Sequence, residues 1–160
     1  MSERPPDKLA IAVAQLNAIV GDVAGNLVRA RKARSQAAHD RADIVAFSEL
    51  FIAGYPPEDL VLKPAFQAAC RTAVETLARD TGDGGPAVLM GTPWVEDGKL
   101  YNAYALLAGG RIEAVRFKVN LPNYGVFDEK RVFATGALPG PVSFRGVRLG
   151  LPVCEDTWTD

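Results

Sequence analysis

Residues 42–50, "ADIVAFSEL", decide the fold that this sequence predicts. The apolar run "IVAF" is short and bounded by polar residues, a pattern that predicts a buried strand ending at Glu49. A segment with helical periodicity precedes this strand, and a second amphipathic segment follows it after a loop rich in glycine and proline, "AGYPPED". Strands that alternate with helices in this way are typical of an α/β domain.

The rest of the chain continues this alternation and then changes to hairpins. The predicted elements are strands over residues 9–16 and 86–94, a helix from about Asn26 to Ala38, a second helix over residues 63–80, and hairpins over residues 99–119 and 142–153 that turn at Gly109–Gly110 and Arg145–Gly146. Residues 120–140 show few regular features. We therefore expect helices packed on a sheet, with functional groups at the carboxyl ends of strands.

The composition fits a globular protein with a sizeable core. The chain has 160 residues, of which 48% are hydrophobic and 23% are charged. The net charge of −1 gives no electrostatic reason to bind nucleic acid or an anionic membrane. No apolar run is typical of a signal peptide or reaches the roughly 20 residues of a membrane span. We expect a cytoplasmic protein with a disordered N-terminus over residues 1–7 and one domain over residues 8–160.

Three reactive side chains follow apolar strands: Glu49, Lys118 after "RIEAVRF", and Cys154 after "VRLGLPV". Each has an ordinary alternative, because the glutamate would suit a turn cap, the lysine a strand edge and the cysteine a small core position. Cys154, however, opens "EDTW", whose acids suit the first turn of a helix. Backbone N–H groups at such a turn stabilise a thiolate and receive an oxyanion. The pattern therefore predicts that Cys154 is a nucleophile.

The other cysteine and the single histidine are expected to be structural. Cys70 lies among the apolar positions of the predicted helix over residues 63–80, so we expect a core residue. His39 ends the first predicted helix, where a solvated histidine interacts well with the helix dipole. A Cys-His mechanism is then unavailable. Two cysteines and one histidine also predict neither a disulfide framework nor a metal site.

Three longer motifs extend these single residues. They are "FSELFIAGYPPEDL" at residues 47–60, "KVNLPNYGVFDEKRVF" at residues 118–133 and "PVCEDTW" at residues 152–158. With these motifs the sequence resembles the nitrilase, or carbon–nitrogen hydrolase, superfamily, and within it the glutaminase domain of glutamine-dependent NAD synthetases. The middle motif is the most specific, because it is long and unusual in composition. The resemblance implies a nitrilase-like α-β-β-α sandwich that is incomplete in this chain.

The resemblance also implies roles for five residues. Glu49 corresponds to the general base, Lys118 to the lysine that stabilises the oxyanion, and Cys154 to the nucleophile. Tyr124 corresponds to a residue that binds L-glutamine, and Glu129 to a second glutamate near the lysine. For Glu129 the alternative is a place in a surface charge cluster, "DEKR", whose basic members are interpreted as surface residues.

The implied reaction is the hydrolysis of L-glutamine, which releases ammonia for the amidation of deamido-NAD in NAD biosynthesis. Glu49 would move the proton, while Lys118 and the backbone N–H after Cys154 would hold the oxyanion. A buried lysine near two glutamates should keep its charge, as this role requires.

The resemblance sets expectations about the rest of such a protein. The C-terminal part of the glutaminase domain and a synthetase domain that uses ATP and Mg²⁺ are expected to be missing from this chain, which would bind no cofactor itself. A homo-oligomer is expected, and the isolated chain is expected to be inactive. Two alternatives stay open: a stand-alone nitrilase-type amidase acting on another small amide, and a non-catalytic fragment or assembly module.

Overall fold

A computed structural model describes residues 8–158, so the predicted disorder of residues 1–7 lies outside the described residues. The strands are β1 (Ile11–Ala14), β2 (Ile44–Phe47), β3 (Ala87–Glu96), β4 (Lys99–Ala108), β5 (Arg111–Phe117), β6 (Val142–Phe144) and β7 (Val147–Leu149). The helices are α1 (Val23–His39), α2 (Pro64–Asp80) and α3 (Glu129–Val132), with 3₁₀ turns η1 (Glu58–Leu62), η2 (Thr81–Asp83) and η3 (Cys154–Thr157). The predicted change from helix-connected strands to hairpins is confirmed. Between residues 8 and 158, no helix is long and apolar enough to cross a membrane.

Five strands form one sheet in the order β1-β2-β3-β4-β5. The first three strands are parallel and are connected by α1 and α2, whereas β3, β4 and β5 pair antiparallel. Gly109 and Gly110, at the predicted turn between β4 and β5, have positive φ angles of 58° and 84°, which suit a two-residue hairpin turn. Since β5 runs in the same direction as β2, the carboxyl ends of these two strands lie at the same edge.

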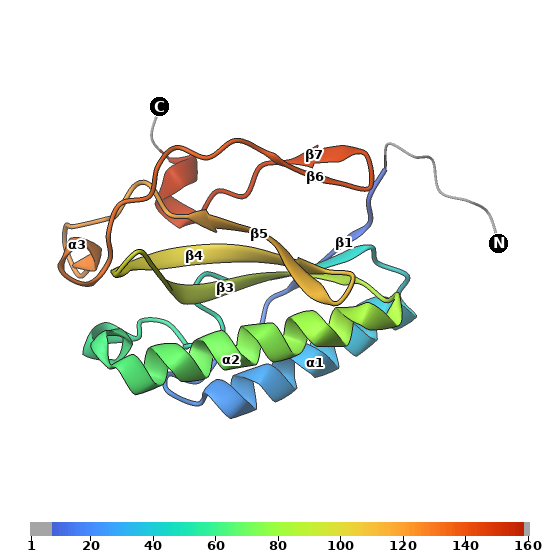
Figure 1. Cartoon of the computed structure of the whole chain (residues 1–160), viewed down its shortest axis with the longest axis horizontal. Helices are drawn as coiled ribbons and strands as arrows, with labels where there is room; N and C mark the ends of the chain where they lie inside the picture. The colour runs from blue at the N-terminus through green and yellow to red at the C-terminus, as the bar shows by residue number, and fades with distance from the viewer. Residues whose placement is uncertain (1–7, 159–160) are drawn as a thin grey trace.

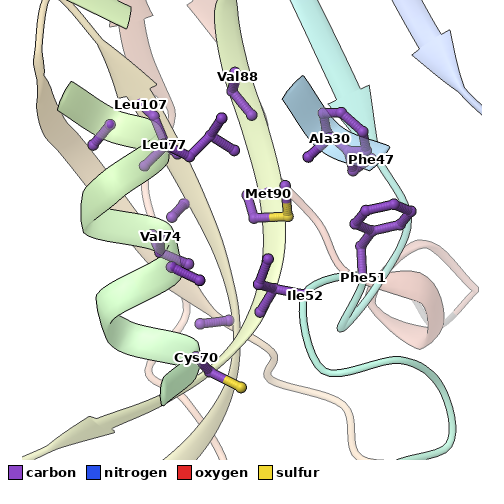
Figure 2. Packing of buried hydrophobic residues seen from close by; sticks show 14 of the residues in the cluster. Ala30, Phe47, Phe51, Ile52, Cys70, Val74, Leu77, Val88, Met90 and Leu107 are labelled. Atoms are coloured by element: carbon purple, nitrogen blue, oxygen red, sulfur yellow. The ribbon is translucent and has the colours of Figure 1, made fainter. Parts of the chain in front are cut away.

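The sheet is covered on both faces. Helices α1 and α2 lie on one face, and the β6–β7 hairpin lies on the other (Figure 1). Figure 2 shows that Val74 and Leu77 of α2 face Met90 of β3 within the larger core cluster. A second cluster, which includes Leu106 and Val142, lies between the sheet and the hairpin. The predicted nitrilase-like fold is confirmed, with three of the four α-β-β-α layers, because the described residues place no long helix outside the hairpin (Figure 1).

Helix α1 begins three residues earlier than predicted, at Val23 instead of Asn26. The carboxylate of Asp22 accepts a hydrogen bond from the N–H of Gly25 at 2.9 Å and so caps the helix. A side-chain cap satisfies one of the N–H groups that the first turn leaves without a helical partner, and this allows the helix to start before its apolar periodicity becomes visible.

Strand β7 ends earlier than predicted, at Leu149 instead of Val153. Pro152 has no N–H group to donate to a strand ladder, and residues 150–153 form no strand. The prediction that Cys154 directly ends a strand is therefore wrong. An irregular segment, and not the sheet, brings Cys154 to its place.

The turn that carries Glu49 packs tightly against Gly91 of β3. The N–H of Ile52 donates to the carbonyl of Gly91 at 3.2 Å. A Cβ atom on Gly91 would lie 2.8 Å from the carbonyl carbon of Glu49, and closer still to the oxygen of Ser48 and the nitrogen of Leu50. These are backbone atoms of a turn that leads into the buried residues 50–53, so they have little freedom to move. A residue without a side chain is therefore required beside Glu49.

We predict that Gly91→Ala lowers the free energy of unfolding of the chain by about 1–3 kcal/mol, the usual cost of overpacking a core. The extra methyl group must displace either β3 or the turn that carries Glu49. Urea unfolding followed by circular dichroism measures the effect. The matched control is Gly140→Ala, where an added Cβ meets no atom within 4 Å, and there we expect a change within about 0.5 kcal/mol. Equal stabilities of the two variants would contradict this account of Gly91.

Candidate active site

Glu49 and Lys118 lie at one edge of the sheet because they follow β2 and β5, which run in the same direction. Glu49 comes two residues after the end of β2, and Lys118 comes immediately after β5. The N–H of Lys118 donates to the carbonyl of Asn102 at 2.8 Å, and its carbonyl accepts from the N–H of Gly136 at 2.9 Å. Hydrogen bonds on both sides thus hold the lysine backbone in place.

The Lys118 ammonium is buried between two carboxylates. Its side chain has no exposed surface, and its Nζ donates to Oε1 of Glu49 at 2.7 Å and to Oε1 of Glu129 at 2.9 Å. Glu129 is the first residue of α3 and is also buried, so it does not lie in a surface charge cluster. Lys118 is likewise no exposed edge residue. The structure therefore brings these three predicted residues into direct contact.

The two partners decide the charge of Lys118. Burial alone would lower the pKa of its ammonium, but the hydrogen bonds and charges of Glu49 and Glu129 outweigh burial, and the pKa lies above its ordinary value. Lys118 therefore stays protonated at neutral pH. Burial raises the pKa of Glu129, and the Lys118 ammonium acts against this rise.

Asn102 is a part of the site that sequence reasoning missed. It lies on β4 and is fully buried, and its Nδ2 donates to Oε1 of Glu49 at 2.7 Å. One oxygen of Glu49 thus accepts hydrogen bonds from both Asn102 and Lys118, which fixes the orientation of the carboxylate. The only sequence signal was an amide in an otherwise apolar strand, "LYNAYALL".

Cys154 presents its thiol at the surface beside this cluster. It is exposed, begins the 3₁₀ turn η3 and has a φ angle of 45°, which is uncommon for a residue other than glycine. Burial of part of the side chain raises the pKa of the thiol, as do the charge of Glu49 and a hydrogen bond with it. The charge of Lys118 and the backbone N–H of Glu155 act in the opposite direction. Both residues predicted to act with Cys154 therefore lie near its sulfur.

Tyr124 lies next to the turn that carries Cys154. Its hydroxyl donates to the two carboxylate oxygens of Glu155 at 3.1 and 3.0 Å, and this hydrogen bond raises the pKa of Tyr124. The tyrosine remains 53% exposed, so it is free to contact a bound molecule. Glu155 was not predicted as a site residue. Its place directly after Cys154 was visible in the sequence, but its contact with Tyr124 was not.

A pocket of about 340 Å³ adjoins the cluster on the side of Glu129. Its lining includes Tyr55, Phe127, Glu129 and Arg131, but not Cys154. Burial raises the pKa of Tyr55 to about 12, and the charges of Glu49 and Glu129 add to this rise, so Tyr55 faces the same acidic centre. Sequence reasoning did not select Tyr55, although it lies within the first of the three motifs.

Other reactive residues lie away from the site. Cys70 is buried in α2, and burial raises its pKa to about 12, as expected for a core thiol. His39 ends α1 with an exposed side chain beside Asp40, as predicted for a solvated residue at a helix end. Arg131 pairs with Asp128 at the surface. In the described part of the chain, no group of three or more His, Cys, Asp or Glu could hold a metal ion.

The assembled groups suit acyl transfer. A thiol supplies a nucleophile, a neighbouring carboxylate supplies a base, and a lysine held in its charged form supplies a donor for a developing oxyanion. The thiol of Cys154, the carboxylate of Glu49 and the ammonium of Lys118 lie together at one edge of the sheet.

Comparison with known proteins agrees with this geometry. Residues 10–160 match the carbon–nitrogen hydrolase family. The glutamine-dependent NAD(+) synthetase of Rhodobacter capsulatus is 43% identical over 152 residues, which cover 95% of this chain and 27% of that protein. The chain therefore spans about a quarter of the length of this relative.

Solved structures show the same relationship. The glutamine-dependent NAD+ synthetase of Acinetobacter baumannii superposes with a TM-score of 0.88 at 34% identity, covering 94% of this chain and 28% of that chain. A variant of the Nesterenkonia AN1 amidase, from the nitrilase superfamily, superposes with a TM-score of 0.81 at 28% identity, covering 98% and 59%. Another structure of that amidase holds the acetamide moiety of fluoroacetamide covalently on its active-site cysteine.

The resemblance to the glutaminase region of NAD synthetases, predicted from three motifs, is thereby confirmed. The match extends through all three motifs and through the described residues that form the cluster around Lys118. The fold, the motifs and the extent of the match lead to one conclusion: this chain belongs to the carbon–nitrogen hydrolase family.

Proposed function

We propose that this chain supplies the glutamine-hydrolysing centre of a glutamine-dependent NAD synthetase. The observation that carries the proposal is the buried Lys118 ammonium between Glu49 and Glu129, beside the exposed thiol of Cys154. The identity to synthetases supports L-glutamine as the substrate. The covalent adduct on the cysteine of the related amidase supports Cys154 as the nucleophile.

In the first half of the reaction, Sγ of Cys154 attacks the carbonyl carbon of the glutamine side-chain amide, and Glu49 takes the thiol proton. The carbonyl oxygen becomes an oxyanion. An ammonium has three N–H donors, and Glu49 and Glu129 engage two of those of Lys118, which leaves one for this oxygen. The N–H of Glu155 would be the second donor. When the C–N bond breaks, Glu49 returns the proton to the leaving nitrogen, and ammonia departs.

In the second half, water attacks the thioester that remains on Cys154. Glu49 takes a proton from the water, the same donors hold the second oxyanion, and the proton passes to the sulfur as glutamate leaves. The raised pKa of Cys154 explains why a base is needed, because the thiol is mostly protonated at neutral pH. The cycle ends with every group of the chain in its starting state.

The wider activity of such a protein is also a proposal. The released ammonia would be used to amidate deamido-NAD in a synthetase domain of the same protein, with ATP and Mg²⁺ bound in that domain and not by this chain. We further propose that the whole protein acts in the cytoplasm as a homo-oligomer. The hydrolysis proposed at Cys154 uses only side chains and backbone groups of this chain and needs neither a metal nor a cofactor.

A stand-alone amidase acting on another small amide is the second candidate. The observation that favours it is the larger share, 59%, of the Nesterenkonia amidase that this chain covers. The higher identity to the synthetases, 43% against 28%, favours glutamine. Ammonia release measured with L-glutamine and with a panel of small amides distinguishes the two. A non-catalytic fragment would release ammonia from none of them.

The first prediction for this function concerns the nucleophile. In the full-length protein, Cys154→Ala should abolish glutamine-dependent NAD synthesis, while free ammonia still supports synthesis, because only the source of ammonia is lost. Coupled assays of NAD formation with glutamine or with an ammonium salt measure this. Cys70→Ala is the matched control and should retain glutamine-dependent synthesis. Survival of glutamine-dependent synthesis in the Cys154 variant would reject this nucleophile.

The second prediction concerns the base. Glu49→Gln keeps the shape of the side chain and removes the proton acceptor, so glutamine hydrolysis should fall by roughly 10²–10⁴-fold, the usual contribution of a general base. His39→Ala should hydrolyse glutamine at nearly the original rate, since the His39 side chain is exposed at the end of α1 and contacts Asp40, not the site. Steady-state ammonia release measures both variants. The reverse order of effects would exclude Glu49 as the base.

The third prediction concerns the 160-residue chain by itself. Cys154 and Tyr124 are both exposed, so a bound amide would be held from one side only, and we expect glutamine turnover below about one hundredth of that of the full-length protein. Exposed Val126, Leu138 and Trp158 should also favour self-association. Ammonia release and light scattering of the isolated chain test this, with the Cys154→Ala chain as background. A compact monomer with turnover near that of the full-length protein would contradict it.

A further inference from the structure

The carboxylate of Asp156 joins two segments that carry reactive residues. Its Oδ1 accepts hydrogen bonds from the backbone N–H groups of Val119 at 3.0 Å and Asn120 at 2.8 Å. Its Oδ2 accepts from the backbone N–H of Val153 at 3.1 Å. One side chain thus receives three backbone donors from two parts of the chain that are more than 30 residues apart in sequence.

These donors are the immediate neighbours of the site. Val119 and Asn120 directly follow Lys118, and Val153 directly precedes Cys154. Lys118 itself is held on its other side by β4, through the carbonyl of Asn102. Asp156 therefore sets how the end of the lysine-bearing strand lies relative to the turn that bears the thiol.

The sheet does not hold the turn that bears Cys154. Strand β7 ends at Leu149, so no strand ladder reaches Cys154. Cys154 has a left-handed φ of 45°, and a conformation of this kind persists only where surrounding contacts enforce it. The bond from the N–H of Val153 to Oδ2 is local, spans three residues and satisfies a donor at the start of η3. The two bonds to Oδ1 reach far along the chain and are not needed for a cap.

We propose that Asp156 is a positioning residue that aligns the Cys154 thiol with the Lys118 ammonium during amide hydrolysis. This inference rests on the proposed function and adds a group that touches neither the substrate nor the reacting atoms. The attack of the thiol and the stabilisation of the oxyanion require Sγ and Nζ to keep a fixed separation. Asp156 maintains this separation through the backbone on both sides.

The alternative is that Asp156 only stabilises the fold, and the chemistry of alkylation separates the two. Iodoacetamide reacts with Cys154 by displacement of iodide, which forms the S–C bond without an oxyanion. This reaction needs an accessible thiolate but no donor for an oxyanion, so at a pH where the thiol is fully ionised it does not depend on alignment with Lys118. Glutamine hydrolysis needs both. A loss of alignment therefore lowers hydrolysis and leaves alkylation almost unchanged, whereas unfolding also makes the buried Cys70 reactive.

The test uses the full-length protein and the variant Asp156→Ala. We expect kcat for glutamine hydrolysis to fall about 10²-fold, the size of effect that a misplacement of about 1 Å produces, with KM within about threefold. The alkylation rate of Cys154, measured at a pH where the thiol is fully ionised and followed by mass spectrometry of its peptide, should stay within about threefold, and Cys70 should stay protected. Ammonia-dependent NAD synthesis should be unchanged. Asp80→Ala, which removes a carboxylate paired with Arg31 on the surface of the helices, is the matched control.

Asp156→Glu keeps the charge, but its longer side chain moves the oxygens away from the N–H groups of Val119 and Asn120. We expect an intermediate loss of kcat, about 10-fold, without exposure of Cys70. If Asp156→Ala exposes Cys70, the alanine variant has lost its fold, and the kcat of Asp156→Glu then separates a positioning role from a structural one. A kcat within about threefold of the original in the folded variant would overturn the proposal. Absence of glutamine hydrolysis in the unmodified protein would instead reject the proposed function.

Discussion

The buried ammonium of Lys118 is the constraint on which the rest of the site depends. Moving a charge out of water costs several kcal/mol, and only close partners of opposite charge offset this cost. Glu49 and Glu129 are those partners, and they come from the turn after β2 and from α3. The end of β5, this turn and α3 must therefore meet at one point. The fold allows it because β2 and β5 run in the same direction through the sheet.

In the proposed reaction, the same arrangement supplies a base and an oxyanion donor without a histidine. Two carboxylates keep the lysine charged, so it is available as a donor and does not compete for the thiol proton. Glu49 lies between Lys118 and Cys154, with 15% of its side chain exposed, and its orientation is fixed by Asn102. A carboxylate held in this way can accept and return a proton on the same side of the substrate throughout the cycle.

The surroundings of the thiol differ from those of the lysine. Lys118 is enclosed by protein, whereas Cys154 and Tyr124 face outward. The matched segment has the same fold in a synthetase and in an amidase, at TM-scores of 0.88 and 0.81. The fold that places Glu49 and Lys118 at one edge of the sheet is thus shared within the family. Under the proposed function, the choice among amide substrates would then depend on side chains around the thiol and on segments outside the match.

The sequence by itself determined the strands of the main sheet, the helices α1 and α2 and the hairpin turns, because each depends on local periodicity or on glycine at a turn. It missed the short helix α3 and misplaced the start of α1 and the end of β7. It also determined Glu49, Lys118 and Cys154 as candidates, through their places after apolar runs and within long motifs. Only the tertiary structure decided that Lys118 is buried against Glu49, a residue 69 positions away, and that Asn102 and Asp156 hold the site together. In the sequence, Asn102 is one amide in an apolar strand and Asp156 one acid in a turn. Their partners are distant in the chain, and local patterns carry no information about such contacts.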